Sequence, residues 1–364
     1  MSDIVFYKNI IKRLIVVTGQ AAESMNLSPR LQELGFIRDR DPFSYPEAEK
    51  MPDDINLWER LFVEHPGFNK VKDVNKSAVL LAEHGGGKTA HRLYFSRMLA
   101  AQRPSWLIVT YASFSLLAPK LPNISTSDHF DILMARIAEA LLAYISEPNH
   151  KEDFLEKRRL PTRKWFWAFL KAYSDKAFQY ELDCQLTTDF AEMEKMSLPL
   201  PFRQSTPLDI AIKNIVQHLH SLGVTRLFLL VDGVDGSDEF KRRADMRALV
   251  NPLLNGLSLL SIPGVVWKFF LPKSLETAVL DSSGYKTGRL SPISIEWDQE
   301  SLAKLLNERL KWASEGLYQR IEDLCSQELL QRTNVERELI KMATRHKYLG
   351  SPRALLSLSR QLCS

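Results

Sequence analysis

Residues 77–96 read SAVLLAEHGGGKTAHRLYFS, and this stretch decides the fold of the chain. The short apolar run at residues 78–81 predicts a buried strand. After three consecutive glycines, Leu93 and Leu99 lie on one face of a helical pattern. The stretch therefore predicts a strand, a glycine-rich loop and a helix, joined in that order.

Each residue type in this loop suits a bound phosphate. Glycines take positive φ and have no Cβ, so the loop can turn its backbone N–H groups toward an anion. Lys88 offers a mobile charge to the β- and γ-phosphates and Thr89 offers a hydroxyl ligand to Mg²⁺, while the helix contributes its positive end. The pattern is a P-loop and predicts ATP and Mg²⁺ as cofactors. The residues expected to bind the nucleotide are Glu83, His84, Gly85, Gly86, Gly87, Lys88, Thr89 and Ala90.

The competing interpretation is a glycine-rich turn that precedes a Lys-Thr pair by chance. Measured against GxxxxGK[ST], the match runs over residues 82–89, with Ala82 in place of the first glycine. The first position of the motif, where the chain leaves the strand, mainly requires a small residue. The apolar run before the loop and the helical pattern after it favour the P-loop.

A second decisive stretch is RLFLLVDGVDGSD at residues 226–238. Residues 227–231 predict a buried parallel strand, and Asp232 follows at its carboxyl end, where parallel α/β sheets bind ligands. This is a Walker B pattern, in which Asp232 is expected to hold Mg²⁺ together with Thr89. Asp235 is placed to orient or deprotonate the attacking water. Taken alone, the segment also fits an apolar strand ending in an Asp-Gly turn.

The remaining periodicity predicts an α/β fold. Apolar runs predict three further strands, at residues 106–110, 265–271 and 293–297. Helical patterns lie between the strands, at residues 127–147, 208–222 and 247–260. Continuous apolar runs are typical of strands covered on both faces. The expected fold class is a P-loop NTPase three-layer sandwich with a central parallel sheet.

The C-terminal part is helical in pattern from residue 298 onward. Helices are expected at residues 302–310, 317–330 and 335–344, and a last one opens with GSPR at residues 350–353, where Pro352 suits a first turn. The expected domains are an N-terminal extension (1–50), an ATPase core (51–297, with a helical insertion at about 127–205) and a helical lid (298–364).

Composition narrows the class of protein. The 364 residues are 45% hydrophobic and 25% charged, which fits a folded globular chain. The formal net charge of +4 is too small to indicate nucleic-acid binding by itself. Three distant cysteines (Cys184, Cys325 and Cys363) indicate neither a disulfide framework nor a zinc site. No apolar run is long enough to span a membrane, so we expect a cytoplasmic protein without membrane contact.

Nucleic acid remains an open alternative because of residues 157–173. There, Trp165, Trp167, Phe169 and Tyr173 are interleaved with basic residues. Such a mixture can stack on bases and neutralise a single strand. More often, it forms the core and the solvated face of one helix.

The order of these elements resembles the additional-strand P-loop ATPases, the branch that contains the AAA+ and STAND groups. The segments VLLAEHGGGKTA (79–90) and LFLLVDGVDG (227–236) look like bacterial ATPases of the STAND and KAP neighbourhood. The resemblance covers roughly residues 41–364. Two features depart from it. Gly233 stands where AAA+ proteins usually carry a catalytic glutamate, and we expect the lid to stand without the effector or sensor domain that STAND proteins usually have.

The resemblance implies further site residues and a function. Lys273 falls in the sensor-1 position, Arg289 in the arginine-finger position and Arg353 in the sensor-2 position, although each also fits a surface charge. The implied function is an ATPase that binds ATP or ADP and acts as a switch or motor. It would be a homo-oligomer working with a separate effector protein, for example in bacterial antiviral defence. A scaffold that binds ATP with negligible hydrolysis is the main alternative, and a small-molecule kinase is the third.

Overall fold

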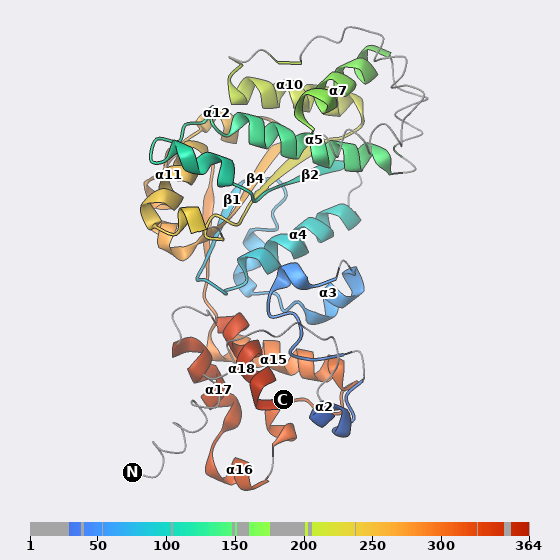
Figure 1. Cartoon of the computed structure of the whole chain (residues 1–364), viewed down its shortest axis with the longest axis vertical. Helices are drawn as coiled ribbons and strands as arrows, with labels where there is room; N and C mark the ends of the chain where they lie inside the picture. Colours follow the sequence, from blue (N-terminus) through green and yellow to red (C-terminus); the bar gives the residue numbers. More distant parts are fainter. Residues whose placement is uncertain are drawn as a thin grey trace. The chain divides into compact units, whose positions relative to one another are not determined.

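The computed structural model describes residues 29–37, 40–52, 54–102, 105–147, 150, 160–174, 201–202, 206–236, 238–325, 327–345 and 351–363. These residues form two compact units (Figure 1). Each unit has its own hydrophobic core. The larger unit comprises residues 66–83 and 88–295. The smaller unit combines the N-terminal segment up to residue 65, the loop 84–87 and residues 296–364.

The larger unit is built on a five-stranded sheet in which every strand pair is parallel, which confirms the predicted central sheet. The strands are β1 (Ala78–Ala82), β2 (Trp106–Tyr111), β3 (Arg226–Val231), β4 (Val265–Pro272) and β5 (Ser291–Ile295). Their order across the sheet is β2-β3-β4-β1-β5. Every residue of β1 and β4 is buried, as expected for central strands covered on both faces.

Helices cover both faces of this sheet (Figure 1). The helices of the larger unit are α4 (Lys88–Gln102), α5 (Phe130–Ser146), α7 (Leu160–Tyr173), α10 (Leu208–Ser221), α11 (Arg243–Leu254), α12 (Leu257–Leu260), α13 (Glu276–Asp281) and α14 (Ser283–Lys286). Alternate strand residues such as Val79 and Leu229 join the core formed with α5, α7, α10 and α11. On the other face, Phe228 meets Phe95 of α4 with ring centroids 6.1 Å apart. The unit therefore has three layers, helix–sheet–helix.

Two predicted helices are interrupted in the structure. The pattern at residues 247–260 was expected to form one helix, but α11 ends at Leu254 and α12 begins at Leu257. Gly256 between them has a non-helical ψ of 74°, in keeping with the low helix propensity of glycine. Residues 317–330 likewise form a 3-10 turn (Ile321–Leu324) and a separate helix α16 (Gln327–Arg332), because Cys325 is extended.

The smaller unit is helical. Its helices are α2 (Pro29–Glu33), α3 (Ile55–Leu61), α15 (Gln299–Ala313), α16, α17 (Val335–Arg345) and α18 (Ser351–Cys363). Short 3-10 turns complete the two units, at Ala48–Lys50, Pro66–Lys70, Ser115–Lys120, Asp238–Phe240, Lys273–Leu275 and Ile321–Leu324.

The core of the smaller unit contains residues from both the N-terminal and the C-terminal parts of the described chain. Leu31 and Phe43 pack with Leu306 and Leu355. Arg309 of α15 is buried and donates from Nη1 to the carbonyl oxygen of Ser44 at 2.7 Å, and burial lowers the pKa of this arginine to about 10. The described residues between 51 and 65 also belong to this unit, whereas the sequence pattern predicts residues 51–297 as one ATPase core. This membership depends on tertiary packing, because α3 packs on α15.

A buried histidine links the sheet to the helices of the larger unit. The hydroxyl of Tyr111 lies 2.7 Å from His129 Nδ1, and His129 Nε2 lies 3.1 Å from the carbonyl oxygen of Leu249. A carbonyl only accepts, so Nε2 carries the proton and Nδ1 accepts from the tyrosine. Burial lowers the pKa of His129 to about 4 and raises that of Tyr111. His129 is therefore neutral in the folded protein at neutral pH.

We expect this histidine to make the fold acid-sensitive. Its pKa is about 4 when folded and 6.5 when unfolded, so only the unfolded chain takes up the proton as pH falls through this window. Between pH 7.5 and pH 5.0, the wild type should lose about 2 kcal/mol more unfolding free energy than His129→Gln, measured by urea denaturation. The glutamine side chain can donate an N–H to the carbonyl oxygen of Leu249, and it does not titrate between these pH values. Equal losses would contradict the expectation.

Candidate functional site

The two sequence motifs meet at the carboxyl edge of the sheet. There β1 ends at Ala82, and β3 ends one residue before Asp232. The parallel register pairs Ala82 with Pro272 of β4, so Lys273 follows at the same edge. The chain therefore brings one candidate residue to the end of each of three neighbouring strands, where parallel α/β proteins bind their ligands.

The glycine loop has the backbone that its sequence predicts. Gly85 and Gly87 have φ values of 74° and 89°, in the left-handed region that glycine adopts without steric cost. Glu83 and His84 precede them with exposed side chains. A side-chain-bearing residue at either glycine would strain the loop.

Lys88 begins helix α4, and its ammonium group folds back over the end of β1. Its Nζ lies 3.4 Å from the carbonyl oxygen of Ala82 and 3.3 Å from that of Glu83. It also lies 3.0 Å from Oδ2 of Asp235, and the lysine side chain is only 7% exposed. The charge expected to bind phosphate is thus buried and paired with the carboxylate expected to act on water. Thr89 and Ala90 follow, half-buried in the first turn of α4.

A second ion pair, between Arg92 and Asp232, was not anticipated from the sequence. Arg92 Nε donates to Asp232 Oδ2 at 2.8 Å, and its Nη1 lies 3.5 Å from the hydroxyl of Thr110 at the end of β2. Both partners are largely buried, so each charge depends on the other. The spacing of Lys88 and Arg92, four residues apart on α4, places both cations on one helix face and is the signal that could have revealed this pair.

The residues expected to hold Mg²⁺ fit that ion. Within the part of the chain that the structure describes, the second carboxylate oxygen of Asp232, Oδ1, is buried and has no hydrogen-bond partner. A buried carboxylate oxygen without a partner is costly and calls for a ligand. Together with the Thr89 hydroxyl it makes an all-oxygen donor set, which is the set that Mg²⁺ prefers.

The backbone at Gly233 disfavours a glutamate directly after Asp232. Its φ is 73°, and a Cβ at this position would lie 3.0 Å from the carbonyl oxygen of Ala112. A glutamate there would need the backbone near Ala112 to move. Asp235 is therefore the carboxylate that the turn after β3 presents beside Lys88.

The structure does not bring all candidate residues together. Lys273 is half-buried at the carboxyl edge, directly after β4. Arg289 precedes β5 and so lies at the amino-terminal edge, the opposite end of the sheet from Lys88. Arg353 lies on α18 in the smaller unit. The arginine-finger role of Arg289 toward a neighbouring copy and the sensor role of Arg353 stay predictions.

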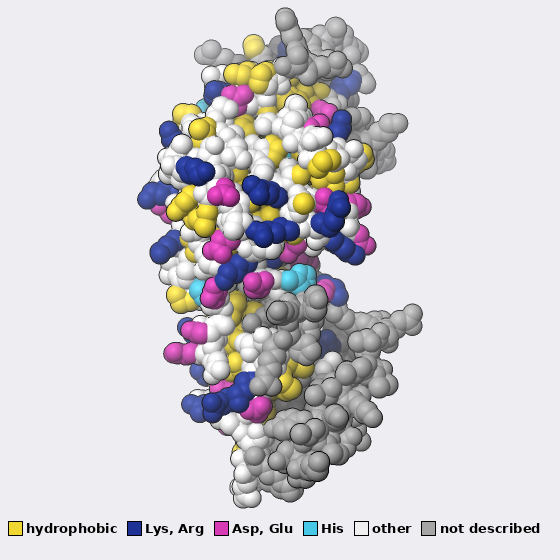
Figure 2. All heavy atoms as spheres, turned by 90° about the vertical axis from the view of Figure 1, so that its left-hand side faces the viewer, with side chains coloured by type: hydrophobic (Ala, Val, Ile, Leu, Met, Phe, Trp, Pro, Cys, Tyr) yellow, Lys and Arg dark blue, Asp and Glu magenta, His cyan; other side chains and the backbone are white. Residues whose placement is uncertain are grey.

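The aromatic residues of α7 form core rather than a stacking surface. Trp167 and Phe169 are at most 1% exposed. Trp165 stacks on His218 of α10, with ring centroids 3.8 Å apart. Figure 2 shows Lys and Arg side chains interspersed with Asp and Glu on the face it presents, without a continuous basic strip. The basic residues at 157–159 lie outside the described residues.

No helix in the described ranges is long and apolar enough to cross a membrane. Comparison of the chain with protein-family models, with curated proteins and with solved structures finds no match.

Proposed function

We propose that the protein binds ATP with Mg²⁺ at the carboxyl edge of its sheet and hydrolyses it, as an AAA+/STAND-like nucleotide switch. The observation that carries this proposal is the meeting of Lys88 with Asp235 at 3.0 Å. Two motifs far apart in the sequence thereby supply a cation and a carboxylate to one loop at the ligand-binding edge.

The strand order supports the same proposal. β4 lies between β1, which carries the glycine loop, and β3, which carries Asp232. An extra strand between the P-loop strand and the Walker B strand is the feature for which the additional-strand class is named. The sheet of this chain is therefore compatible with that class.

Each residue has a distinct role in the proposed reaction. Lys88 and the loop N–H groups bind the β- and γ-phosphates. Thr89 and Asp232 would hold Mg²⁺, which when bound neutralises phosphate charge. Asp235 accepts the proton of the attacking water, and Lys273 contributes a cation at the same edge.

The Lys88–Asp235 pair couples nucleotide binding to activation of the attacking water by Asp235. Before nucleotide binds, Asp235 is paired with the Lys88 ammonium group, which is the cation expected to bind the phosphates. When phosphate oxygens take over Lys88, Asp235 loses that partner and becomes available to the water. Nucleotide binding would thereby replace the lysine partner of Asp235 by the attacking water.

Replacing Asp235 by asparagine tests this arrangement. We expect ATP affinity to stay equal or rise, because Lys88 loses its competing carboxylate, while kcat falls about a hundredfold or more with the loss of the base. Calorimetry gives the affinity and Mg²⁺-dependent phosphate release gives kcat. A fall in affinity with unchanged kcat would contradict the role of Asp235.

The scaffold alternative is favoured by one observation, the glycine at position 233. If the wild type binds ATP but releases no phosphate with Mg²⁺, alone or with its effector, the protein is an ATP-dependent scaffold. A cytoplasmic homo-oligomer, a separate effector and a place in bacterial antiviral defence are further parts of the proposal. They rest on the resemblance to STAND proteins.

A further inference from the structure

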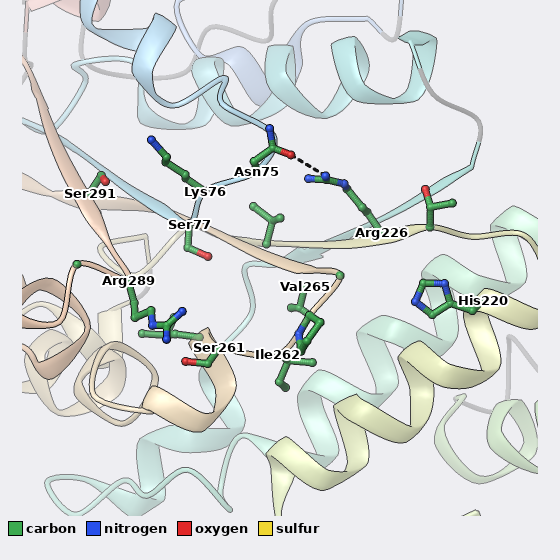
Figure 3. A pocket seen from close by; sticks show the side chains of 16 residues that line it. Asn75, Lys76, Ser77, His220, Arg226, Ser261, Ile262, Val265, Arg289 and Ser291 are labelled. Atoms are coloured by element: carbon green, nitrogen blue, oxygen red, sulfur yellow. Dashed lines mark hydrogen bonds between the residues drawn. The ribbon is translucent and has the colours of Figure 1, made fainter.

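A cavity lies at the amino-terminal edge of the sheet, within the larger unit. It has a volume of about 600 Å³ and is lined by the segments leading into β1, β4 and β5 and by the start of β3 (Figure 3). This volume lies in the range of small-molecule sites. The cavity is separate from the glycine loop, which lies at the carboxyl ends of the same strands.

The lining of this cavity is positively charged. Lys76, Arg226 and Arg289 line it, and its lining residues include no aspartate or glutamate. Lys76 pairs with Asp73 at 3.7 Å, which offsets part of its charge. The cavity therefore favours an anion over a neutral or cationic ligand.

Arg289 is the cation that remains available. Arg226 is already committed, since it donates to the carbonyl oxygen of Val74 and, at 2.6 Å, to Asn75 Oδ1. The Arg289 side chain extends into the cavity toward Ser261 (Figure 3). Among the residues described, it makes neither a hydrogen bond nor an ion pair. Its guanidinium thus presents a set of donors with no protein acceptor, in a form suited to phosphate oxygens.

The rest of the lining adds contacts for an organic group. Ile262 and Val265, both largely buried, contribute apolar surface, and Ser261 contributes a hydroxyl. A phosphate monoester carries nearly two negative charges and three acceptor oxygens, so it interacts more strongly with the Arg289 guanidinium than a single carboxylate does. We propose that this cavity binds a small organic phosphate, anchored through its phosphate group by Arg289.

The test uses ribose 5-phosphate as the probe and the full-length chain carrying Lys88→Ala, so that the glycine loop is disabled. Calorimetry at low salt should show binding with the same affinity in the wild type and in this variant. Adding Arg289→Gln should weaken binding at least about tenfold. The matched control Lys286→Gln removes an exposed charge outside the lining and should change affinity less than about twofold.

Hydrogen exchange locates the ligand. The probe should protect residues 260–266 and 288–291, and not the loop 84–89. Absence of binding, equal affinity in Arg289→Gln, or loss of binding caused by Lys88→Ala alone would overturn the proposal. Inorganic phosphate that binds as tightly as the probe would overturn its organic part. Failure of ATP to bind at the glycine loop would leave these outcomes unchanged, so the two proposals are distinguishable.

Discussion

Replacing Lys88 by alanine should weaken ATP binding about ten- to a hundredfold. The variant loses a charge-assisted contact to phosphate worth on the order of 1.5–3 kcal/mol. In the structure, this ammonium is buried beside the carbonyl oxygens of Ala82 and Glu83, at the start of α4. No other lysine or arginine lies within the loop 83–88. Calorimetry on wild type and variant measures the effect.

The control for this experiment is Lys286→Ala, which removes an exposed lysine of α14. It should leave ATP affinity unchanged. Lys88→Ala also leaves Asp235 without its lysine partner, but that carboxylate is 20% exposed and can be hydrated, so folding should survive. Unchanged ATP affinity in a folded Lys88→Ala protein would show that the glycine loop is not a phosphate site.

Replacing Asp232 by asparagine should remove the Mg²⁺ dependence of ATP binding. The quantity to measure is the ratio of the ATP Kd in EDTA to that in Mg²⁺. We expect a ratio well above one in the wild type and close to one in the variant, because a neutral amide is a poor ligand for a hard cation. Phosphate release should fall at least about a hundredfold, since charge at the departing phosphoryl group is no longer compensated.

Arg92 provides the matched control, because Asp232 also pairs with it at 2.8 Å. Breaking a buried ion pair from one side costs about 3–5 kcal/mol, so a loss of function could follow from misfolding. Asparagine keeps an oxygen that accepts from Arg92. Arg92→Lys perturbs the same pair but preserves the carboxylate, and should retain the Mg²⁺ dependence. If Asp232→Asn keeps the wild-type ratio, Asp232 serves only to anchor Arg92.

Much of the local structure could be predicted from the sequence. The run at residues 78–81 and the run at 227–231 predicted buried strands, and both are buried in a parallel sheet. The glycines predicted a left-handed backbone, which Gly85 and Gly87 adopt. These features depend on neighbours within a few residues, through steric limits on φ and ψ and through the burial of alternate or continuous apolar side chains.

Helix boundaries and domain membership were predicted less well. The break at Gly256 was missed because leucines continue the apolar pattern on both sides of it. The segment around α3 was assigned to the core because its apolar residues do not reveal which partner they bury against. Periodicity indicates that a face is buried but not what covers it.

The sequence by itself determined which segments are strands, where the glycine loop lies, and that Lys88 and Asp232 each follow the carboxyl end of a strand, where ligands bind. Only the tertiary structure decided that β4 separates β1 from β3, that Arg92 pairs with Asp232 across 140 residues, and that Arg289 faces a cavity at the opposite edge. The reason is physical. Local patterns are set by backbone sterics and by burial, whereas strand order and long-range ion pairs depend on how the crossover helices pack, which no short stretch encodes.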